Sequence, residues 1–355
     1  MKEKINILMC GSRFDVKGGM VTVAKNYTEY KDWGEYNIIY IPTHIEKNKL
    51  VVSIYFGISL MKILFTVKTK KISVAHLHIA EKGSFYRKAI LLRILKKFGI
   101  KVVLHHHAAE FEEFYASLNA KKRKFVNKTL ELADMNIVLS KDLIKMITSK
   151  EEKATVTALY NAVTVYDANP YNYKGNGILF LGRLGERKGV YDLLKAIRLI
   201  DNEISPKIQF YLCGDGEIDK VHREVQKMEI EHRIAHIGWI NADDKKKIYK
   251  NTIINVLPSY NEGLPMSILE TMAYGIPNIS TSIAAIPEVI ENNKNGCLIK
   301  PGDVKNLAKN IKSLVDSEEK RKNMSNEAYF LIKEKFSIEN SINQLKKIYE
   351  KLMKE

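Results

Sequence analysis

The chain has 355 residues, 45% of them hydrophobic and 28% charged, which is the composition of an ordinary soluble globular protein long enough for about two domains. Its three cysteines, at positions 10, 213 and 297, are too widely spaced for a zinc site or a disulfide framework, and no apolar signal core stands at the N-terminus. We therefore expect a cytoplasmic protein and not a secreted one.

The net charge of +16 is unevenly spread, because residues 61–150 contain 19 basic and 7 acidic residues, a net charge of +12. Such a surface attracts an anionic partner, either a nucleic acid, an anionic membrane or a phosphorylated substrate. A surface that is merely basic, without such a partner, is the alternative.

The first half of the chain alternates short apolar runs with helical patterns, which predicts a parallel sheet covered by helices. Strands are expected at 5–10, 37–41, 74–78, 102–106 and 136–139, and helices at 20–30, 85–98 and 122–133. Residues 50–67 carry one charge, Lys62, and predict either a helix buried in this domain or a membrane span. The polar and small residues Ser53, Gly57 and Ser59 favour the buried helix.

A polar, turn-rich connector at 160–177 separates this half from a second one, in which the same alternation begins again. Strands are expected at 178–181, 208–213, 234–238, 255–258, 278–280 and 297–299, and helices at 190–200 and 264–274. The tail from residue 304 is helical. We predict an α/β protein of two Rossmann-like domains, 1–165 and 166–337, with the last helix, 338–355, packing back on the first domain.

Ligands of open parallel sheets bind beyond the carboxyl ends of the strands, so each strand-to-helix junction is a candidate site. Gly18 and Gly19 precede the first helix and can bring backbone N–H groups to an anion, although a plain flexible turn fits equally well. Arg183 and Lys188 lie five residues apart in a glycine-bounded loop and can converge on one diphosphate. The alternative for that loop is a solvated charged turn.

The loop after the strand at 255–258 carries Glu262, and the following helix carries Glu270 about two turns later. The backbone N–H groups of Gly263 and Leu264 stand at the start of that helix, where they attract negative charge. A carboxylate in such a place is usually a helix cap. Glu270 is harder to explain in that way, because its helix is otherwise apolar.

The segment 257–303, which contains both glutamates, resembles the donor-binding region of the retaining glycosyltransferases of family 4. The Glu-x7-Glu spacing, the Gly-Arg-Leu-x3-Lys-Gly loop at 182–189, and the segments 213–217, 238–240 and 160–163 all match the family's pattern. The first domain resembles the family only in its architecture, its Gly18-Gly19 loop and a histidine after a strand. The resemblance implies the GT-B fold, with two Rossmann-like domains facing each other across a cleft.

The resemblance also implies a role for each matching residue. Arg183 and Lys188 would hold the donor diphosphate, and Glu270 the ribose hydroxyls. Glu262 would contact the transferred sugar with the help of the Gly263 and Leu264 N–H groups. The remaining donor-binding residues would be Gly214, Trp239 and Ile240 near the base, and Gly18 and Gly19 near the phosphates.

A histidine after the strand at 102–106 would face the sugar, and we assign this role to His107, with His106 as the rival. Alternation along the strand puts His105 and His107 on one face and His106 on the other, so these three histidines cannot readily converge on one metal ion. Glu110 is a further candidate, for acceptor hydroxyls. The family usually needs no divalent metal, and Asp243-Asp244 looks like a helix cap, so we expect no metal and no cofactor.

The helix at 85–98 is basic and amphipathic, which is typical either of binding to anionic lipid or of an ordinary helix against a sheet. We predict a retaining transferase that moves a hexose or N-acetylhexosamine from a UDP-linked nucleotide sugar to a glycan or polyprenyl-diphosphate-linked oligosaccharide. It would act in capsule or exopolysaccharide synthesis, on the inner face of a bacterial membrane. The alternatives are a nucleotide-sugar epimerase, a phosphorylase or, without any matching motif, a nucleic-acid-binding protein.

Overall fold

The computed structural model describes residues 4–107 and 110–355. The chain divides into two compact units. Unit 1 comprises Met1–Ala162 together with the C-terminal segment Ile338–Glu355, and unit 2 comprises Val163–Ser337. The C-terminal helix therefore belongs to the first unit, and the chain passes from one unit to the other at 162/163 and again at 337/338.

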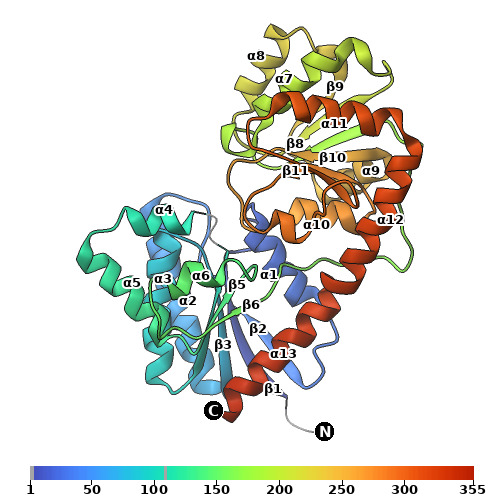
Figure 1. The fold of residues 1–355 in the computed structure, drawn as a ribbon. Helices are drawn as coiled ribbons and strands as arrows, with labels where there is room; N and C mark the ends of the chain where they lie inside the picture. Colours follow the sequence, from blue (N-terminus) through green and yellow to red (C-terminus); the bar gives the residue numbers. More distant parts are fainter. Residues whose placement is uncertain (1–3, 108–109) are drawn as a thin grey trace. The chain divides into compact units, whose positions relative to one another are not determined.

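Within the described residues, unit 1 contains a six-stranded parallel sheet in the order β2-β1-β3-β4-β5-β6 (Figure 1). Its strands are β1 (Ile5–Cys10), β2 (Tyr36–Tyr40), β3 (Ile72–Ile79), β4 (Lys101–His106), β5 (Met135–Val138) and β6 (Val156–Ala158). Its helices are α1 (Gly19–Glu29), α2 (Lys49–Thr69), α3 (Gly83–Lys97), α4 (Phe111–Ala116), α5 (Ala120–Leu132), α6 (Ile144–Thr148) and α13 (Ile338–Lys354).

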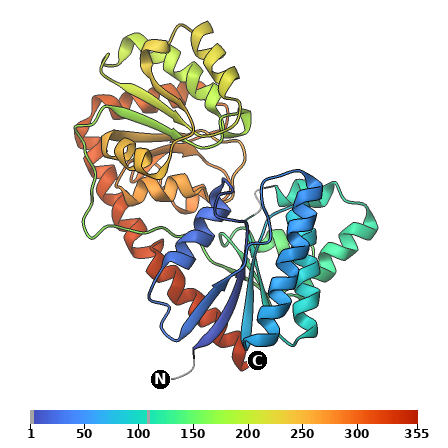
Figure 2. The same ribbon diagram turned by 180° about the vertical axis from the view of Figure 1, so that it is seen from behind.

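The two faces of this sheet carry different side chains. Leu77 and Leu104 point to the face covered by α3 and α5, where they join the main apolar core. In the view from behind, these helices lie to the right of the strands (Figure 2). His76 and His105 point to the opposite face, which α1 and α13 cover. The Tyr27 hydroxyl of α1 lies 2.9 Å from the Ser341 hydroxyl of α13 and ties these two helices together.

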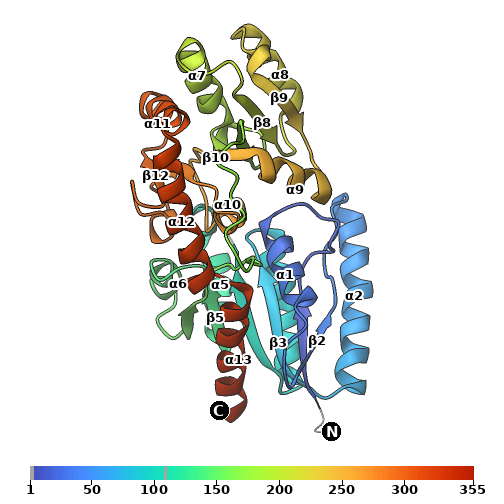
Figure 3. The same cartoon turned by 90° about the vertical axis from the view of Figure 1, so that its right-hand side faces the viewer.

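The prediction of a buried helix at 50–67 is wrong. These residues do form a helix, α2, but only about a tenth of its most apolar 18-residue window is buried (11%). Val52, Ser59 and Ile63 face the unit, while most of the remaining side chains are open to solvent. In Figure 3 α2 stands at the edge of unit 1, with the rest of the unit on one side only. By length and composition α2 could cross a membrane.

Unit 2, whose residues are all described, contains a second six-stranded parallel sheet in the order β12-β11-β10-β7-β8-β9. The strands are β7 (Gly177–Leu181), β8 (Gln209–Cys213), β9 (Ile234–Gly238), β10 (Thr252–Leu257), β11 (Asn278–Thr281) and β12 (Gly296–Ile299). The helices are α7 (Val190–Ile200), α8 (Ile218–Lys227), α9 (Ala242–Asn251), α10 (Met266–Ala273), α11 (Val304–Asp316) and α12 (Glu318–Lys335). Short 3-10 helices lie at Glu186–Lys188, Asp201–Glu203, Glu231–Arg233 and Ile286–Glu288.

Helices α7 and α11 pack on one face of this sheet, and α9 and α10 on the other (Figure 1). The start of α9 differs from the prediction, because Asn241 is its N-cap and accepts hydrogen bonds from the N–H groups of Asp243 and Asp244, both at 2.9 Å. These two aspartates therefore lie in the first helical turn, where their charge suits the helix dipole, and do not cap the helix themselves.

Candidate active site

Three loops of unit 2 follow strands that are neighbours in the sheet, namely β8, β7 and β10. Backbone hydrogen bonds tie the loop after β7 to the loop after β8. The N–H of Leu184 donates to the carbonyl of Asp215 at 2.6 Å, and the N–H of Glu217 donates back to the carbonyl of Leu184 at 2.8 Å. Because the strands are parallel, their carboxyl ends lie at one edge of the sheet, which is where such folds bind ligands.

Two glycines allow these loops to approach so closely. A Cβ atom on Gly214 would lie 1.8 Å from the carbonyl oxygen of Gly182, in the loop after β7. Gly189 has a φ of +75°, and a Cβ atom there would lie 2.0 Å from the carbonyl oxygen of Pro258, in the loop after β10. Any larger residue at either position would push the neighbouring loop away, so these glycines determine where the loop side chains stand.

Lys188 and Glu262 form an ion pair between the loop after β7 and the loop after β10. Both side chains are largely buried, with exposed fractions of 15% and 6%. The hydroxyl of Ser259 donates a second hydrogen bond, at 2.7 Å, to the same carboxylate oxygen, Oε1 of Glu262. Since an unpaired charge in such a place costs roughly 3–5 kcal/mol, the pairing of the two groups holds both side chains in position.

Glu270 lies on α10 and is held by α9. The ammonium group of Lys245 and the hydroxyl of Tyr249 both donate to its Oε2 atom, each at 2.9 Å. Burial, and then the nearby Glu270 carboxylate, raise the pKa of Tyr249 well above its ordinary value, so the phenol remains a donor. One face of Glu270 is therefore engaged by α9, and its Oε1 atom is the oxygen that remains for a hydroxyl-bearing ligand.

Arg183 is held loosely. Its guanidinium lies 3.9 Å from Oδ2 of Asp215, and 65% of the side chain is exposed, so it can move towards an anion at low cost. Trp239 follows β9 and is 53% exposed, while Ile240 packs partly into a small apolar cluster around Leu179. Gly263 accepts a backbone hydrogen bond from Ala285, and Leu264 is buried at the start of α10.

The predicted residues of unit 2 therefore lie on the loops and helix starts that follow four strands of one sheet. Of them, Lys188 and Glu262 are in direct contact, Gly214 lies against the loop that carries Arg183, and Glu270 lies eight residues after Glu262, in the second turn of α10. Sequence reasoning missed their partners Ser259, Lys245 and Tyr249. The four-residue spacing of Lys245 and Tyr249, which puts both on one face of a helix, was the available signal for these two.

A cavity of about 640 Å³ lies beside the loop after β7, on the side of α7 and α8. Its charged lining residues, among those described, are Glu186, Arg187, Asp192, Lys195, Lys220 and Glu224. Positive and negative groups are equal in number and pair with one another, as in the contact of 3.1 Å between Lys195 and Asp192. Such a lining offers no excess charge for a diphosphate, and none of the predicted donor-binding side chains belongs to it.

Comparison with known proteins indicates the class of reaction to which this site belongs. Residues 167–330, almost the whole of unit 2, match the family described as "Glycosyl transferases group 1". The chain carries a glycosyltransferase domain. The prediction of a glycosyltransferase is thus confirmed, and all unit 2 residues discussed above lie within the matched range.

Similarity extends beyond this domain. The chain is 27% identical over 346 residues to the "UDP-Gal:alpha-D-GlcNAc-diphosphoundecaprenol alpha-1,3-galactosyltransferase" of Escherichia coli, covering 91% of this chain and 85% of that protein. Sucrose-phosphate synthase from Thermosynechococcus elongatus has a similar structure, with a TM-score of 0.80, 16% identity and coverage of 98% and 99% of the two chains. Anabaena HepE, solved in complex with UDP-glucose, has a TM-score of 0.77, 15% identity and coverage of 98% and 100%. These structural matches confirm the predicted α/β fold of GT-B type.

In unit 1 of this glycosyltransferase, the residues predicted near the ligand lie at the carboxyl ends of β1 and β4. Gly18 has a φ of +133° and directly precedes α1, which begins at Gly19. The side chain of Glu110 pairs with Lys82, at 3.2 Å. The arrangement agrees with the prediction that the first glycine pair opens a helix, and the strained φ explains why a glycine stands there.

The predicted alternation along β4 is confirmed. His106 points into the core face, where its Nε2 lies 3.0 Å from Oδ1 of Asn136, while His107 points to the other face, with its Nε2 2.9 Å from Nδ1 of His78. Burial, and then the nearby His76 and His106, lower the pKa of His107 to about 3. His106 is enclosed, and His107 is the half-buried member of the pair. Of the two rings, His107 is therefore the one that is partly open to solvent.

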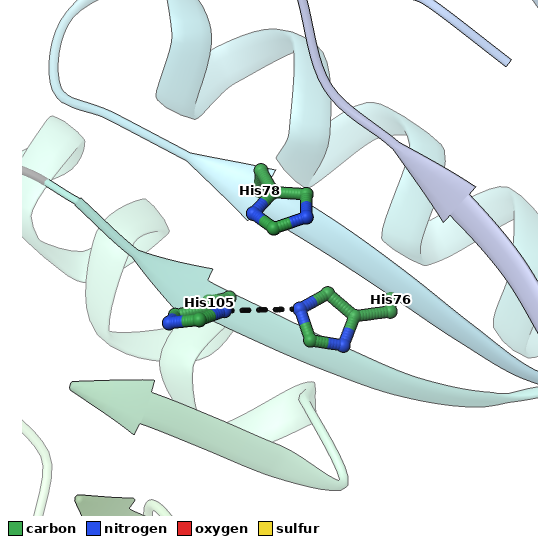
Figure 4. A group of neighbouring side chains, drawn as sticks. All are labelled: His76, His78 and His105. Atoms are coloured by element: carbon green, nitrogen blue, oxygen red, sulfur yellow. Dashed lines mark hydrogen bonds between the residues drawn. The ribbon is translucent and has the colours of Figure 1, made fainter. Parts of the chain in front are cut away.

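His105 takes part in a cluster that the sequence did not reveal. His76 and His78 on β3 and His105 on β4 have ring nitrogens within 4.8 Å of one another (Figure 4). Nε2 of His76 lies 3.1 Å from Nδ1 of His105, and Nδ1 of His76 lies 2.7 Å from the hydroxyl of Tyr349 on α13. A metal ion would have to replace the hydrogen bond between the two rings. In the present arrangement the cluster joins β3, β4 and α13.

Proposed function

We propose that this protein is a retaining glycosyltransferase of family 4 that uses a UDP-linked hexose or N-acetylhexosamine. The observation that carries the proposal is the Lys188–Glu262 ion pair at the carboxyl edge of the sheet, followed by Glu270 in the second turn of α10. A nucleotide sugar combines a diphosphate with two hydroxyl-bearing rings. The site offers two cations for the first and two carboxylates for the second.

Each residue then has a definite role. Arg183 and Lys188 bind the diphosphate and stabilise the negative charge that develops on the leaving UDP, so the reaction needs no divalent metal. Glu270 accepts hydrogen bonds from the ribose hydroxyls, and Glu262 orients the transferred sugar together with the N–H groups of Gly263 and Leu264. Trp239 and Ile240 border the base, beside Gly214. In unit 1, Gly18 and Gly19 offer backbone N–H groups to an anion, and His107 offers a neutral ring to a ligand.

The acceptor is proposed to be a glycan carried on polyprenyl diphosphate, in the synthesis of a surface polysaccharide such as a capsule or exopolysaccharide. The relative from Escherichia coli is named for an acceptor of this kind, and the surplus of basic residues between 61 and 150 suits an anionic acceptor and an anionic membrane. The protein would then act in the cytoplasm as a peripheral protein on the inner face of the cell membrane.

The test is a transfer assay with radiolabelled UDP-glucose, UDP-galactose and their N-acetyl counterparts, with GlcNAc-diphosphoundecaprenol as the acceptor and EDTA present. We expect label to move to the lipid fraction with one of these donors and the new linkage to be α, as shown by its NMR coupling constant. Conversion of the donor without any acceptor would indicate an epimerase. Phosphate-dependent release of sugar from a glycan would indicate a phosphorylase, and either result would refute the proposal.

A further inference from the structure

The surface that best fits a membrane in unit 1 is α2, and not the basic helix that the sequence suggested. Helix α3 has its apolar side chains Phe85, Leu91 and Leu92 in the core. Three of its five basic residues are also engaged: Lys88 donates to the hydroxyl of Thr43, Arg93 lies over the ring of Phe125, at 4.3 Å, and Lys96 pairs with Asp134, at 2.8 Å. The face of α3 that would contact lipid is therefore already used within the protein.

Helix α2 presents an apolar face that the described part of the protein leaves uncovered. Large side chains recur every three or four residues along it, and their exposed fractions range from 39% to 72%. They are Leu50, Val51, Ile54, Ile58, Met61 and Phe65. This spacing places them on one side of a helix, over a length of about 23 Å at 1.5 Å per residue. Exposed apolar stripes of such size are uncommon on monomeric soluble proteins and mark interaction surfaces.

The opposite side of α2 is firmly attached to unit 1. Ile63 is completely buried, and the hydroxyl of Ser59 donates to the carbonyl of Pro42, at 2.8 Å, in the loop after β2. Leu60 and Val67 pack partly into the core of the unit. A helix bound along one side in this way lies on the surface of a folded domain, so the apolar stripe faces a partner and does not cross a bilayer on its own.

The charges around the apolar stripe indicate which kind of partner it binds. Residues 49–71 contain five lysines and neither aspartate nor glutamate, and all five lysines, at positions 49, 62, 68, 70 and 71, are exposed. Two copies of this chain meeting through α2 would bring ten like charges together without a carboxylate from either helix. An anionic lipid surface supplies both the apolar depth and the negative charge that this helix lacks.

We propose that α2 is the membrane-docking element of this protein, with its apolar stripe, Leu50 to Phe65, in the interfacial region of an anionic bilayer and its lysines at the lipid headgroups. The proposal deepens the proposed membrane location and rests on it, but it concerns lipid binding and not catalysis. A failure to bind lipid can therefore be distinguished from a failure to transfer sugar.

The test is co-sedimentation of the full-length protein with vesicles of phosphatidylcholine, alone or with 30% phosphatidylglycerol. We expect binding to the anionic vesicles, and a loss of at least tenfold in the double variant Met61→Ser with Phe65→Ser, because two large apolar side chains no longer enter the lipid. Changing Lys68, Lys70 and Lys71 to Gln should weaken binding to the anionic vesicles only. The matched control is Phe330→Ser on α12, whose side chain is 63% exposed.

Two controls keep the result unambiguous. All substituted side chains are exposed, and the thermal shift induced by UDP should be the same in every variant, which shows that the fold and the donor site are intact. Equal vesicle binding by wild type and the α2 double variant, or no binding by either, would overturn the proposal. So would a dimer in light scattering that the same double variant converts to a monomer, because α2 would then dock a second copy.

Discussion

The buried histidines of unit 1 predict an unusual sensitivity to mild acid. Burial is the main cause of the low pKa values of His76, about 3, and His106, about 4. In an unfolded chain the pKa of histidine is about 6.5. Below pH 6.5 the unfolded chain therefore binds protons that the folded chain does not. The stability contributed by the neutral rings is complete above pH 6.5 and is lost as the pH falls towards the folded-state values.

The magnitude is worked out for His76 and His106, two of the four buried histidines in the described part of unit 1. Each pH unit below 6.5 costs about 1.4 kcal/mol for each histidine kept neutral, so a drop to pH 5.0 costs about 2 kcal/mol per ring. For His76 and His106 together the loss is about 4 kcal/mol, a large part of the 5–15 kcal/mol that is typical of a folded domain. Unit 1 should therefore begin to lose stability before the acidic residues titrate.

The assay uses the two tryptophans of the chain, one in each unit. In a Trp239→Phe background, Trp33 alone reports on unit 1, where it is buried and donates to the carbonyl of Tyr27, at 2.9 Å. Urea unfolding is followed at pH 7.5, 6.0 and 5.0 for this protein, for His106→Gln and for a control, His222→Gln, on the exposed side of α8. The difference in the free energy of unfolding between the Trp239→Phe protein and its His106→Gln variant should shrink by about 2 kcal/mol from pH 7.5 to 5.0. Parallel curves for these two proteins would refute the reasoning.

Three further predictions concern unit 2 and the thiols. Gly189→Ala forces a side chain into a backbone with a φ of +75° and against the carbonyl of Pro258, so UDP binding should weaken at least tenfold while far-UV circular dichroism stays unchanged; unaltered binding would show that the loop can move freely. Arg233→Met should lower the free energy of unfolding by about 3–5 kcal/mol, since it leaves the buried Asp201 without the guanidinium 2.6 Å away. UDP binding at 10 °C should persist in this variant. A variant as stable as wild type would contradict the importance of this ion pair. All three thiols are buried, and burial raises the pKa of Cys10 to about 12, so Ellman's reagent should detect no thiol in the native protein and three after denaturation.

Sequence patterns located the strand-to-helix loops of unit 2 well because the conformation of these loops depends on local backbone chemistry. Glycines that permit close approach, such as Gly189, and the eight-residue interval between Glu262 and Glu270 are visible in one dimension. The partners of these residues were not predicted, because contacts such as Lys245 with Glu270 depend on how α9 packs beside α10. Likewise, short elements such as β6 and α4 carry too few residues to show a period.

The helix at 50–67 shows a different limit. Hydropathy measures how apolar a segment is and does not show what covers it, so the same pattern describes a core helix, a membrane span and the exposed α2. The histidine cluster has a similar origin, since His76 and His105 lie 29 residues apart and meet only because β3 and β4 are neighbours in the sheet. In both cases the outcome depends on tertiary contacts, which the sequence pattern does not contain.

The central claim is that two cations and two glutamates of unit 2 surround one nucleotide sugar, and isothermal titration with UDP and UDP-glucose tests it most directly. Lys188→Met combined with Glu262→Gln removes the ion pair without leaving a buried charge alone, and Glu270→Gln removes the proposed ribose contact. Both should bind UDP-glucose at least tenfold more weakly than wild type, because each loses charge-assisted hydrogen bonds. Lys312→Met, which affects an exposed pair on α11, should bind as wild type does. Equal affinity in all four proteins, or no binding of either ligand to wild type, would contradict the account.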